Sequence, residues 1–365
     1  MKSLNQTFVS LLRIALGNAE RLDMVPTAED WTQLMSMASA QGVIGVMFCG
    51  VERLPKEQMP PIEVIMDWLA VVDYVEQANR RQNGLCVKVC EDFRTEGTKM
   101  CVLKGQGMSV CYPQPLRRSN GDIDIWMSGG EVEVTKEMKR KFHNVKDRNL
   151  FHVSVTLEDG TELEAHFRPM RLTSKKYNMR LQQWVKKVET QQWNHMVELP
   201  ERVGRIPVPT AEYNLVFILL HLIHHWAFEG CGMKQLVDYY WLVATLEKEE
   251  RVEDLRTNAV KVLKELGFGR FLEAVMYIFK EWGMRDEYLL CMPNERWGRR
   301  LLKDILDVGI VSAFDLSDGK YGKETKIGKF WRRFWRLCRL FPLAPVEMPL
   351  VWWENVAWWF KQRMR

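Results

Sequence analysis

LKGQGMSVCYPQPLRRSNGDIDIWM, residues 103–127, couples a glycine-containing turn to an Asp-x-Asp pair. Side chains alternate along a strand, so Asp122 and Asp124 point to one face and the neighbouring isoleucines point to the other. Two carboxylates on one face, roughly 6–7 Å apart by the rise per residue, repel each other unless a cation lies between them. A solvated acidic face on an edge strand would also contain such a pair. Evidence from other segments is therefore needed to distinguish a solvated face from a metal site.

A second segment supplies another carboxylate. The runs FHVSVTL (151–157) and TELEAHF (161–167) flank Glu-Asp-Gly, which is typical of a hairpin turn. In the second run Glu162, Glu164 and His166 share one face. If this strand lies beside the Asp-x-Asp strand, Glu164 becomes a third carboxylate. Three acidic oxygens suit Mg²⁺, and two such ions can clamp the attacking and leaving oxygens of a nucleotidyl transfer.

The turn at the start of the quoted stretch offers a place for phosphates. Lys104-Gly105-Gln106-Gly107 precedes the segment MSVCY, for which we expect a helix. Such a placement lets backbone N–H groups and a helix N-terminus approach a triphosphate. We therefore expect Lys104, Gly105, Gly107 and Ser109 to bind a nucleotide.

The overall composition is that of a folded protein. The chain has 365 residues, of which 47% are hydrophobic and 27% are charged, and its net charge is +5. This length predicts two or three packed units. The mild positive charge suits phosphorylated ligands, but it is too small to indicate nucleic-acid binding by itself.

Several features bear on the compartment. Eight cysteines without a Cys-x-x-Cys pair indicate thiols in a reducing environment. The first twenty residues have the pattern of an amphipathic helix rather than of a signal peptide. The longest apolar run, LVFILLHLI at 215–223, is about half as long as a membrane span. We therefore expect a cytoplasmic protein with no transmembrane segment.

The sequence patterns divide the chain into three regions. Residues 1–98 are helical, and Pro60-Pro61 opens a long helix within them. Residues 99–208 alternate strand, helix, strand, helix and hairpin, which predicts a small mixed α/β core. Residues 209–365 are helical again. We expect an α+β fold in which this core, with its small mixed sheet, is flanked by N-terminal and C-terminal helical regions.

Five short motifs follow one another in a fixed order. They are LKG at 103–105, Tyr112-Pro113, Arg118, GDIDIW at 121–126 and LEAHF at 163–167. This series resembles the uncharacterised nucleotidyltransferase family of the DNA polymerase beta-like superfamily. The family pattern runs Leu-Lys-Gly, Arg, Asp-Ile-Asp and a later Val-Glu-x-His. The resemblance covers the central region, and parts of the flanking helices agree with it.

The resemblance implies a minimal nucleotidyltransferase fold. It also implies a metal-dependent enzyme that moves an NMP group from an NTP to an acceptor hydroxyl or phosphate, with two Mg²⁺ ions. Asp122 and Asp124 would be metal ligands, and Glu164 would be the third carboxylate, a position that in the superfamily can also take the acceptor's proton. The superfamily's usual Gly-Ser or Gly-Gly signature is here Lys104-Gly105, which is normal for the smaller family.

Three further residues of the central region have two interpretations each. Arg118 could pair with a phosphate or form a salt bridge with Asp122, whereas Arg117 is expected to face solvent. His166 lies on the acidic face and could orient Glu164 or touch the substrate. His152 lies on the neighbouring strand. For both histidines a structural hydrogen bond explains the sequence as well as a catalytic role does.

The C-terminal helices contain further candidates for the substrate cleft. His221 and His225 stand at i and i+4 on one helical face. The segment lacks a Glu or Cys at the spacing of a zinc motif, so we do not predict zinc. Lys234 and Asp238 match a basic-x-x-x-Asp pattern of the resembled family. They could line the cleft opposite the metal face, but we favour a structural tie between two helices.

The chain ends in a basic and aromatic tail, GKFWRRFWRLCRLF (328–341) and PLVWWENVAWWFKQRMR (349–365). A helix on a membrane surface or a nucleic-acid stacking surface would have this composition. Tryptophans that pack on the protein body, with arginine heads in water, would have it too. We favour the last interpretation and do not expect membrane contact.

The sequence is compatible with three functions. The first is the nucleotidyltransferase, which the presence of Asp122, Asp124 and Glu164 favours. The second is a catalytically inactive nucleotide-binding or regulatory protein on the same fold. The third is an enzyme that adds nucleotides to RNA ends. The residues do not specify which NTP is used, or whether the acceptor is a small molecule, a peptide or protein, or RNA.

Overall fold

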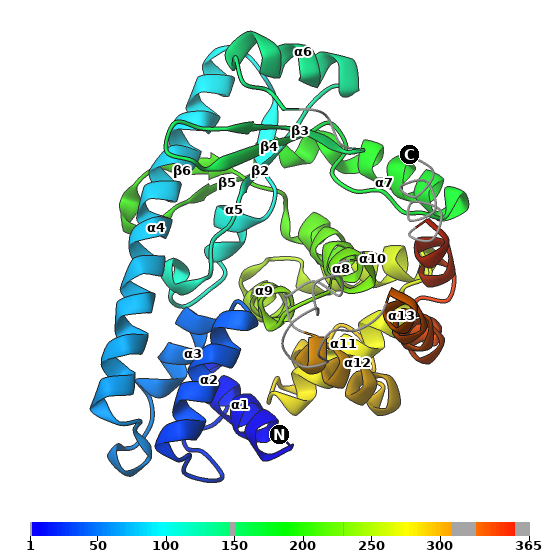
Figure 1. Ribbon diagram of the computed structural model, residues 1–365. Helices are drawn as coiled ribbons and strands as arrows, with labels where there is room; N and C mark the ends of the chain where they lie inside the picture. The colour runs from blue at the N-terminus through cyan, green and yellow to red at the C-terminus, as the bar shows by residue number, and fades with distance from the viewer. Residues whose placement is uncertain (1, 147–149, 229, 309–325, 355–365) are drawn as a thin grey trace.

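The computed structural model describes residues 2–146, 150–228, 230–308 and 326–354. Helices dominate it, and one small mixed sheet lies at one end of the molecule (Figure 1). The expected α+β class, a small mixed sheet flanked by N-terminal and C-terminal helices, is confirmed.

Three helices form the end of the molecule far from the sheet. They are α1 (Lys2–Ala15), α2 (Ala28–Ala40) and α3 (Ile44–Val51). Helix α2 begins with a capping box, in which Asp30 N donates to Thr27 Oγ1 at 3.2 Å and Thr27 N donates to Asp30 Oδ2 at 3.0 Å. These reciprocal bonds satisfy backbone donors that have no partner within the helix.

Helix α4 (Ile62–Thr95) begins directly after the proline pair, as expected, and runs from the N-terminal helices to the sheet (Figure 1). Its buried face is apolar near both ends, where Trp68 and Phe93 are fully buried. In the middle of the same face Asn79 and Gln82 are buried as well. Buried amides have to find hydrogen-bond partners, so this part of α4 is suited to hold a polar loop.

The sheet has the strand order β1-β2-β4-β3. Its strands are β1 (Met100–Val102), β2 (Ile123–Met127), β3 (His152–Thr156) and β4 (Glu162–His166). Strands β2 and β4 are parallel neighbours, and the other two pairings are antiparallel. The Asp-x-Asp strand thus lies directly beside the second strand of the hairpin.

The two faces of the sheet have different surroundings. One face, with Ile125 and Leu163, packs against α4 and against α6 (Glu131–Lys141) in a hydrophobic core. The opposite face carries Asp124 and Glu164 and looks onto a cleft whose far wall is made by C-terminal helices. The alternation of side chains along β2 therefore separates an apolar core from a polar site.

A segment between the sheet and the C-terminal helices contains elements that the sequence analysis did not predict. It holds α7 (Lys175–Gln192) and an antiparallel pair formed by β5 (Met196–Glu198) and β6 (Arg205–Pro207). Each of these strands has three residues, which is too short to produce a recognisable alternation.

The C-terminal helices share a hydrophobic core with the N-terminal ones. These helices are α8 (Ala211–Phe228), α9 (Met233–Thr245), α10 (Val252–Glu265), α11 (Gly269–Glu281), α12 (Glu295–Val308) and α13 (Lys326–Leu340). Short 3₁₀ turns occur at Lys56–Gln58, Pro115–Arg117, Pro200–Arg202, Leu246–Lys248, Asp286–Tyr288 and Phe341–Leu343. Phe8 and Trp31 belong to the same buried cluster as Phe271 and Trp282. The division at 98/99 and 208/209 stays a prediction.

Helix α13 orients its side chains opposite to our expectation for the tail. Arg336 Nη2 lies 2.7 Å and Arg339 Nη2 lies 2.9 Å from carboxylate oxygens of Asp304, which is 1% exposed. Trp331 and Trp335 are instead 51% and 65% exposed. The interpretation with buried tryptophans and solvated arginines is therefore wrong for Trp331, Trp335 and Arg336, whereas the side chain of Arg339 is still 50% exposed. Arg336 is drawn inward because a buried carboxylate needs cationic partners.

The rest of the tail is described in part. Trp353 is also 65% exposed, and residues 355–365 lie outside the described residues. Within the described ranges, every helix is too short or too polar to span a lipid bilayer.

Candidate functional site

Three carboxylates converge on the polar face of the sheet. Asp124 and Glu164 are register partners on the parallel strands β2 and β4, and Asp122 stands just before β2 on the same face. One oxygen from each lies within 4.8 Å of the others. The chain thus brings together the three acidic residues that the sequence analysis placed in one site.

Asp124 has an ammonium and an imidazole as close neighbours. Lys104 Nζ lies 2.8 Å and His166 Nε2 lies 2.9 Å from Asp124 Oδ1. Burial alone would raise the pKa of Asp124, but the Lys104 ammonium and the His166 hydrogen bond hold this pKa well below its ordinary value. Asp124 is therefore a carboxylate at neutral pH despite being 4% exposed.

The other two carboxylates have different surroundings. Desolvation and the neighbouring Asp124 carboxylate raise the pKa of Asp122 above its ordinary value. Glu164 Oε2 lies 3.3 Å from His152 Nδ1 and 3.3 Å from His166 Nε2. A bound cation would stabilise the charged form of Asp122.

The two histidines beside Glu164 differ in their preferred protonation state. Burial lowers the pKa of His166, but hydrogen bonds to Asp124 and Glu164 outweigh it and leave this pKa above its ordinary value. Burial and the neighbouring His166 lower the pKa of His152. His166 therefore retains its proton to higher pH than His152.

A cleft of about 420 Å³ lies between the polar face of the sheet and helices α8 and α9. Most of the predicted site residues line it: Lys104, Gly105, Arg118, Asp122, Asp124, His152, Glu164, His166, His221, His225, Lys234 and Asp238. Five of the chain's seven histidines belong to its lining, and their ring nitrogens can donate or accept hydrogen bonds there.

Two predicted nucleotide-binding residues do not reach this cleft. A side chain at Gly107 would contact Val208 Cγ1 at 3.0 Å, so this glycine allows close packing against the chain before α8. Ser109 is buried, and its Oγ donates to Gln106 O at 2.8 Å within α5 (Gly105–Ser109). The prediction that both bind nucleotide is corrected, because a five-residue helix turns them into the interior.

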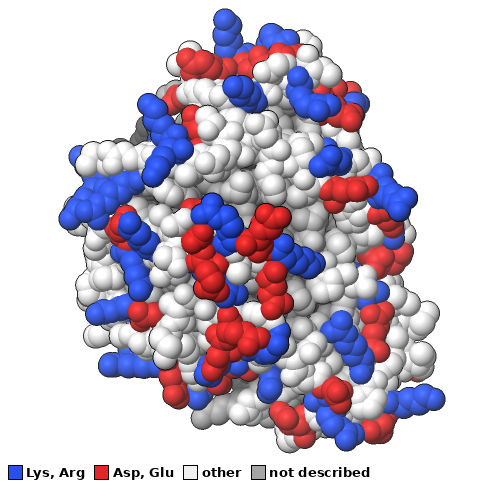
Figure 2. All heavy atoms as spheres, turned by 180° about the vertical axis from the view of Figure 1, so that it is seen from behind, with Lys and Arg blue, Asp and Glu red and all other residues white. Residues whose placement is uncertain are grey.

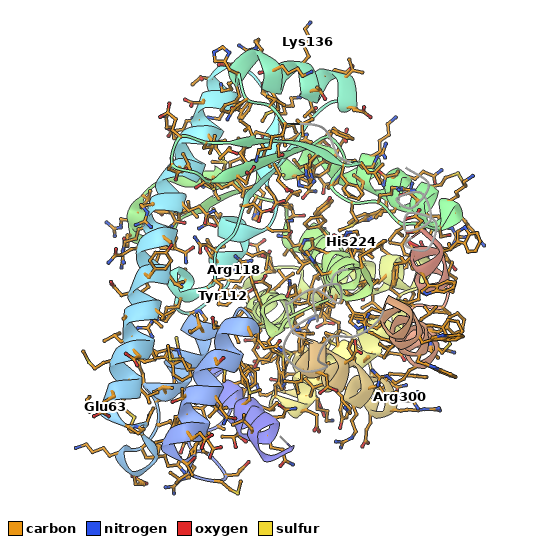
Figure 3. The ribbon with its side chains drawn as sticks, viewed as in Figure 1. Glu63, Tyr112, Arg118, Lys136, His224 and Arg300 are labelled. Carbon is orange, nitrogen blue, oxygen red and sulfur yellow. The ribbon has the colours of Figure 1, made fainter. Side chains whose placement is uncertain are left out.

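Arg118 does not form the salt bridge with Asp122 that the sequence allowed. Its Nε and Nη2 donate to Asp238 Oδ1 and Oδ2 at 2.7 and 2.9 Å, and Tyr112 Oη donates to Asp238 Oδ1 at 2.6 Å. Arg118 and Tyr112 lie close together between α4 and the C-terminal helices (Figure 3). Arg118 therefore holds α9 rather than Asp122, and the tie that we favoured for Asp238 joins α9 to the loop before β2.

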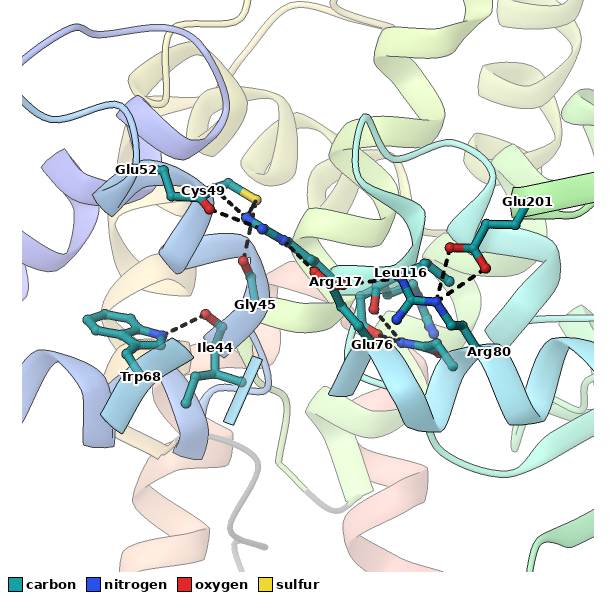
Figure 4. Close-up of polar contacts among 12 residues, drawn as sticks. Ile44, Gly45, Cys49, Glu52, Trp68, Glu76, Arg80, Leu116, Arg117 and Glu201 are labelled. Atoms are coloured by element: carbon teal, nitrogen blue, oxygen red, sulfur yellow. Dashed lines mark hydrogen bonds and ion pairs between the residues drawn. The ribbon is translucent and has the colours of Figure 1, made fainter. Parts of the chain in front are cut away.

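Arg117 is paired rather than facing solvent. Its guanidinium contacts Glu52 at the end of α3, Glu76 of α4 at 2.9 Å, and the Cys49 sulfur at 3.4 Å (Figure 4). Its backbone also approaches Gly45 so closely that a Cβ there would overlap the Arg117 carbonyl oxygen. The loop before β2 is thus fixed to the N-terminal helices.

Amides of α4 hold the same loop from another side. Asn79 Nδ2 donates to Leu116 O at 2.7 Å and to Arg118 O at 2.8 Å, and Gln82 Nε2 donates to Gly121 O. Neither Asn79 nor Gln82 was among the predicted site residues. Polar residues at helical spacing within an otherwise apolar stripe were the signal that could have revealed them.

The opposite wall of the cleft comes from α8 and α9. His221 Nε2 and His225 Nε2 are 3.1 Å apart, and burial, together with the Lys104 charge, lowers the pKa of His221 well below its ordinary value. Burial and the Arg118 charge lower the pKa of Lys234 to about 8. Lys234 is thus an ammonium at neutral pH, and a phosphate would stabilise its charge.

The donor set fits a hard divalent cation. The three clustered oxygens of Asp122, Asp124 and Glu164 are of the kind that Mg²⁺ binds, and they leave room for water and substrate oxygens as further ligands. His152, Glu164 and His166 form a second close group that shares Glu164 with the first. Imidazole nitrogens are less suited to Mg²⁺, so the carboxylate group is the better candidate.

Comparison with known proteins gives three findings. A family described as uncharacterised nucleotidyltransferase matches residues 27–283, which is more than half of the chain. The chain is similar to the crystal structure of an antigenic nucleotidyltransferase-like protein from Paracoccidioides brasiliensis, at 11% identity over 53% of this chain and 92% of that one. The TM-score of 0.30 is too low for this likeness to carry an argument. No curated protein sequence matches the chain.

Proposed function

The chain belongs to the uncharacterised nucleotidyltransferase family, and from this premise we propose that it is a metal-dependent enzyme. It moves an NMP group from an NTP to a hydroxyl or phosphate of an acceptor. The observation that carries this proposal is the convergence of Asp122, Asp124 and Glu164 in a cleft that also contains basic side chains.

Each group of residues has a role in this proposal. Asp122, Asp124 and Glu164 hold Mg²⁺, with two ions expected, and the bound metal neutralises charge on the phosphates. Lys104 and Lys234 attract the triphosphate, and the Gly105 backbone lets it approach. Such positioning and charge stabilisation supply most of the rate in transfers of this kind.

The remaining residues position these groups or line the cleft. Arg118 and Asp238 fix the loop before β2 against α9. His166 orients Asp124 and Glu164, and His152 contacts Glu164 from the neighbouring strand. His221 and His225 form part of the substrate wall rather than a zinc site.

The inactive alternative predicts nucleotide binding without transfer. Retention of all three carboxylates in one cluster favours the enzyme, because a binding protein has no need of that charge repulsion. In an enzyme that binds cations, the repulsion among the three carboxylates favours binding of the metal, because the metal neutralises their charge. We therefore keep catalysis as the proposal and nucleotide binding alone as the result that would replace it.

An enzyme acting on RNA ends would need a basic surface to hold the strand. On the described part of the face in Figure 2, basic and acidic side chains are interspersed and form no continuous basic surface. The charges seen there do not favour the RNA alternative. We also propose a cytoplasmic location, which the eight cysteines without disulfides support.

A thermal-shift experiment tests the proposal directly. ATP, GTP, CTP and UTP are each added with and without Mg²⁺ to the wild type, to Asp122→Asn and to Asp67→Asn, an exposed control on α4. We expect one or more NTPs to raise the Tm of the wild type and the control when Mg²⁺ is present, and not that of Asp122→Asn. Absence of a metal-dependent shift with every NTP would contradict the proposal.

A second measurement distinguishes transfer from binding. The protein is incubated with α-labelled NTP, Mg²⁺ and a cell extract, and pyrophosphate and labelled products are followed. Transfer releases pyrophosphate and labels an acceptor. A nucleotide-dependent Tm shift without either product would support the inactive alternative.

A further inference from the structure

Two of the three clustered carboxylates, Asp122 and Glu164, border a second hollow besides the cleft. This hollow has a volume of about 690 Å³ and lies between α4 and the β3–β4 hairpin. It shares Gly121, Asp122 and Glu164 with the cleft, and its other walls are different. Asp122 and Glu164 thus stand where the two openings meet, which is the arrangement that a transfer between two substrates requires.

The two openings differ in charge once the shared carboxylates are set aside. In the cleft the three cations Lys104, Arg118 and Lys234 face the two anions Asp124 and Asp238, and five histidines also line it. In the hollow the charged residues are two cations and two anions, Arg81, Lys146, Asp159 and Glu162. The Lys146 ammonium also contacts the Glu162 carboxylate. The cleft therefore suits the anionic triphosphate, and the hollow suits an uncharged molecule.

One buried residue that lines the hollow has an acceptor atom without a donor. Gln82 is 4% exposed, and its Nε2 donates to Gly121 O. Among the described residues its buried Oε1 has no hydrogen-bond partner, although Gln82 lines the hollow. A buried carbonyl without a partner is costly, so the side chain gains a hydrogen bond if it turns Oε1 toward a ligand hydroxyl in the hollow.

Other side chains of the hollow are polar and neutral, or aromatic. Asn120, Ser154 and Thr161 offer amide and hydroxyl groups, and Tyr74 of α4 is 68% exposed at the same hollow. Amides and hydroxyls both donate and accept, as alcohol groups do. An exposed aromatic ring with a polar tip provides a flat apolar surface for the C–H face of a ring-shaped ligand.

We propose that this hollow is the acceptor site and that the acceptor is a neutral, hydroxyl-rich small molecule of the sugar or sugar-alcohol class. This inference rests on the proposed function, which it deepens by naming the acceptor class. In the transfer an acceptor hydroxyl oxygen attacks the α-phosphorus of the NTP. A new O–P bond forms, the bond to the pyrophosphate oxygen breaks, and pyrophosphate leaves through the cleft. The hydroxyl proton passes to water.

The test measures acceptor binding separately from nucleotide binding. A panel of free monosaccharides, disaccharides and sugar alcohols is screened by saturation-transfer NMR, with and without an α,β-methylene NTP analogue and Mg²⁺. The variants are Tyr74→Ala and Gln82→Leu, with Met66→Ala as a control that is 58% exposed on the same helix. We expect Tyr74→Ala and Gln82→Leu to weaken saccharide binding by about fivefold to tenfold, as loss of one or two neutral contacts does. Met66→Ala should bind as the wild type does.

The outcomes separate this inference from the proposed function. Saccharide binding that is lost in Tyr74→Ala supports the acceptor site even if the NTP analogue does not bind, in which case the proposed function fails alone. Equal binding by wild type and Tyr74→Ala overturns the inference, as does binding of none of the panel. Tyr74→Ala carries the test if Gln82→Leu fails to fold, because Tyr74 is exposed. Labelling of protein or RNA in place of a saccharide in the cell extract also overturns it.

Discussion

Arg118 and Asp238 form a two-pronged ion pair between the loop before β2 and helix α9, with N–O distances of 2.7 and 2.9 Å. The side chains are 6% and 9% exposed, so the pair is screened little by water. It joins the strand that carries the catalytic candidates to the helix that carries Lys234. Both residues line the cleft.

Asp238→Ala should lower the free energy of unfolding by about 3–5 kcal/mol, because it leaves the Arg118 charge buried without a partner. Chemical denaturation measures the change. The exposed pair Arg251–Asp254 supplies the control, for which Asp254→Ala should cost about 0–1 kcal/mol. A double variant that combines Arg118→Met with Asp238→Leu removes both charges. If it loses as much stability as Asp238→Ala does, the unpaired Arg118 charge is not the cause of the loss.

Asp122→Asn should raise the Tm at neutral pH in the absence of metal and abolish transfer. The pKa of Asp122 is raised in the folded protein, so its charged form opposes folding once the pH exceeds that pKa. The gain in Tm over the wild type should therefore grow as the pH rises from below 3.8 through the folded-state pKa, and then level off. A lower Tm for Asp122→Asn at pH 7 would contradict this account.

Lys234→Met should stabilise the protein below about pH 8 and weaken NTP binding. Burial lowers the pKa of Lys234 from 10.5 to about 8, so the unfolded chain binds this proton more strongly than the folded one does. Wild-type stability should rise relative to Lys234→Met between about pH 8 and 10.5, which closes the gap. Thermal melts from pH 7 to 10.5 check the sign, and NTP titrations check the loss of affinity.

Two glycine substitutions should have opposite effects. Gly45→Ala should destabilise the protein, because its Cβ would overlap the backbone of Arg117. Gly84→Ala, on α4, places its Cβ in open space and should stabilise by about 0.5–1 kcal/mol through helix propensity. Denaturation of both variants provides the measurement, and a neutral Gly45→Ala would mean that the loop at Arg117 can move away.

The exposure of the tail's tryptophans can be tested by comparing Trp335 of α13 with Trp226, a buried tryptophan of α8. Trp226 is fully buried and its Nε1 donates to Asp304 at 3.1 Å, so Trp226→Ala should cost about 3–5 kcal/mol. Trp335 is 65% exposed, and Trp335→Ala should change stability by about 0.5 kcal/mol or less. A large loss in Trp335→Ala would restore the interpretation in which the tail's tryptophans pack on the body.

The sequence alone determined the local structure and the chemistry of the polar strands. Alternation along residues 122–127 placed Asp122 and Asp124 on one face, and the hairpin turn before Glu162 placed Glu164 on a matching face. The order of the LKG, Asp-Ile-Asp and Glu-x-His motifs predicted the family, which the match over residues 27–283 confirmed. These inferences succeeded because they depend on spacing within short segments.

Tertiary structure decided the partners of the charged residues. The sequence could not tell that Arg118 binds Asp238, 120 positions away, or that Arg336 of the tail binds Asp304. It also could not tell that Ser109 is turned into the interior. A buried charge takes its partner from whichever element the fold brings within about 3 Å, and chain packing sets that distance rather than sequence spacing.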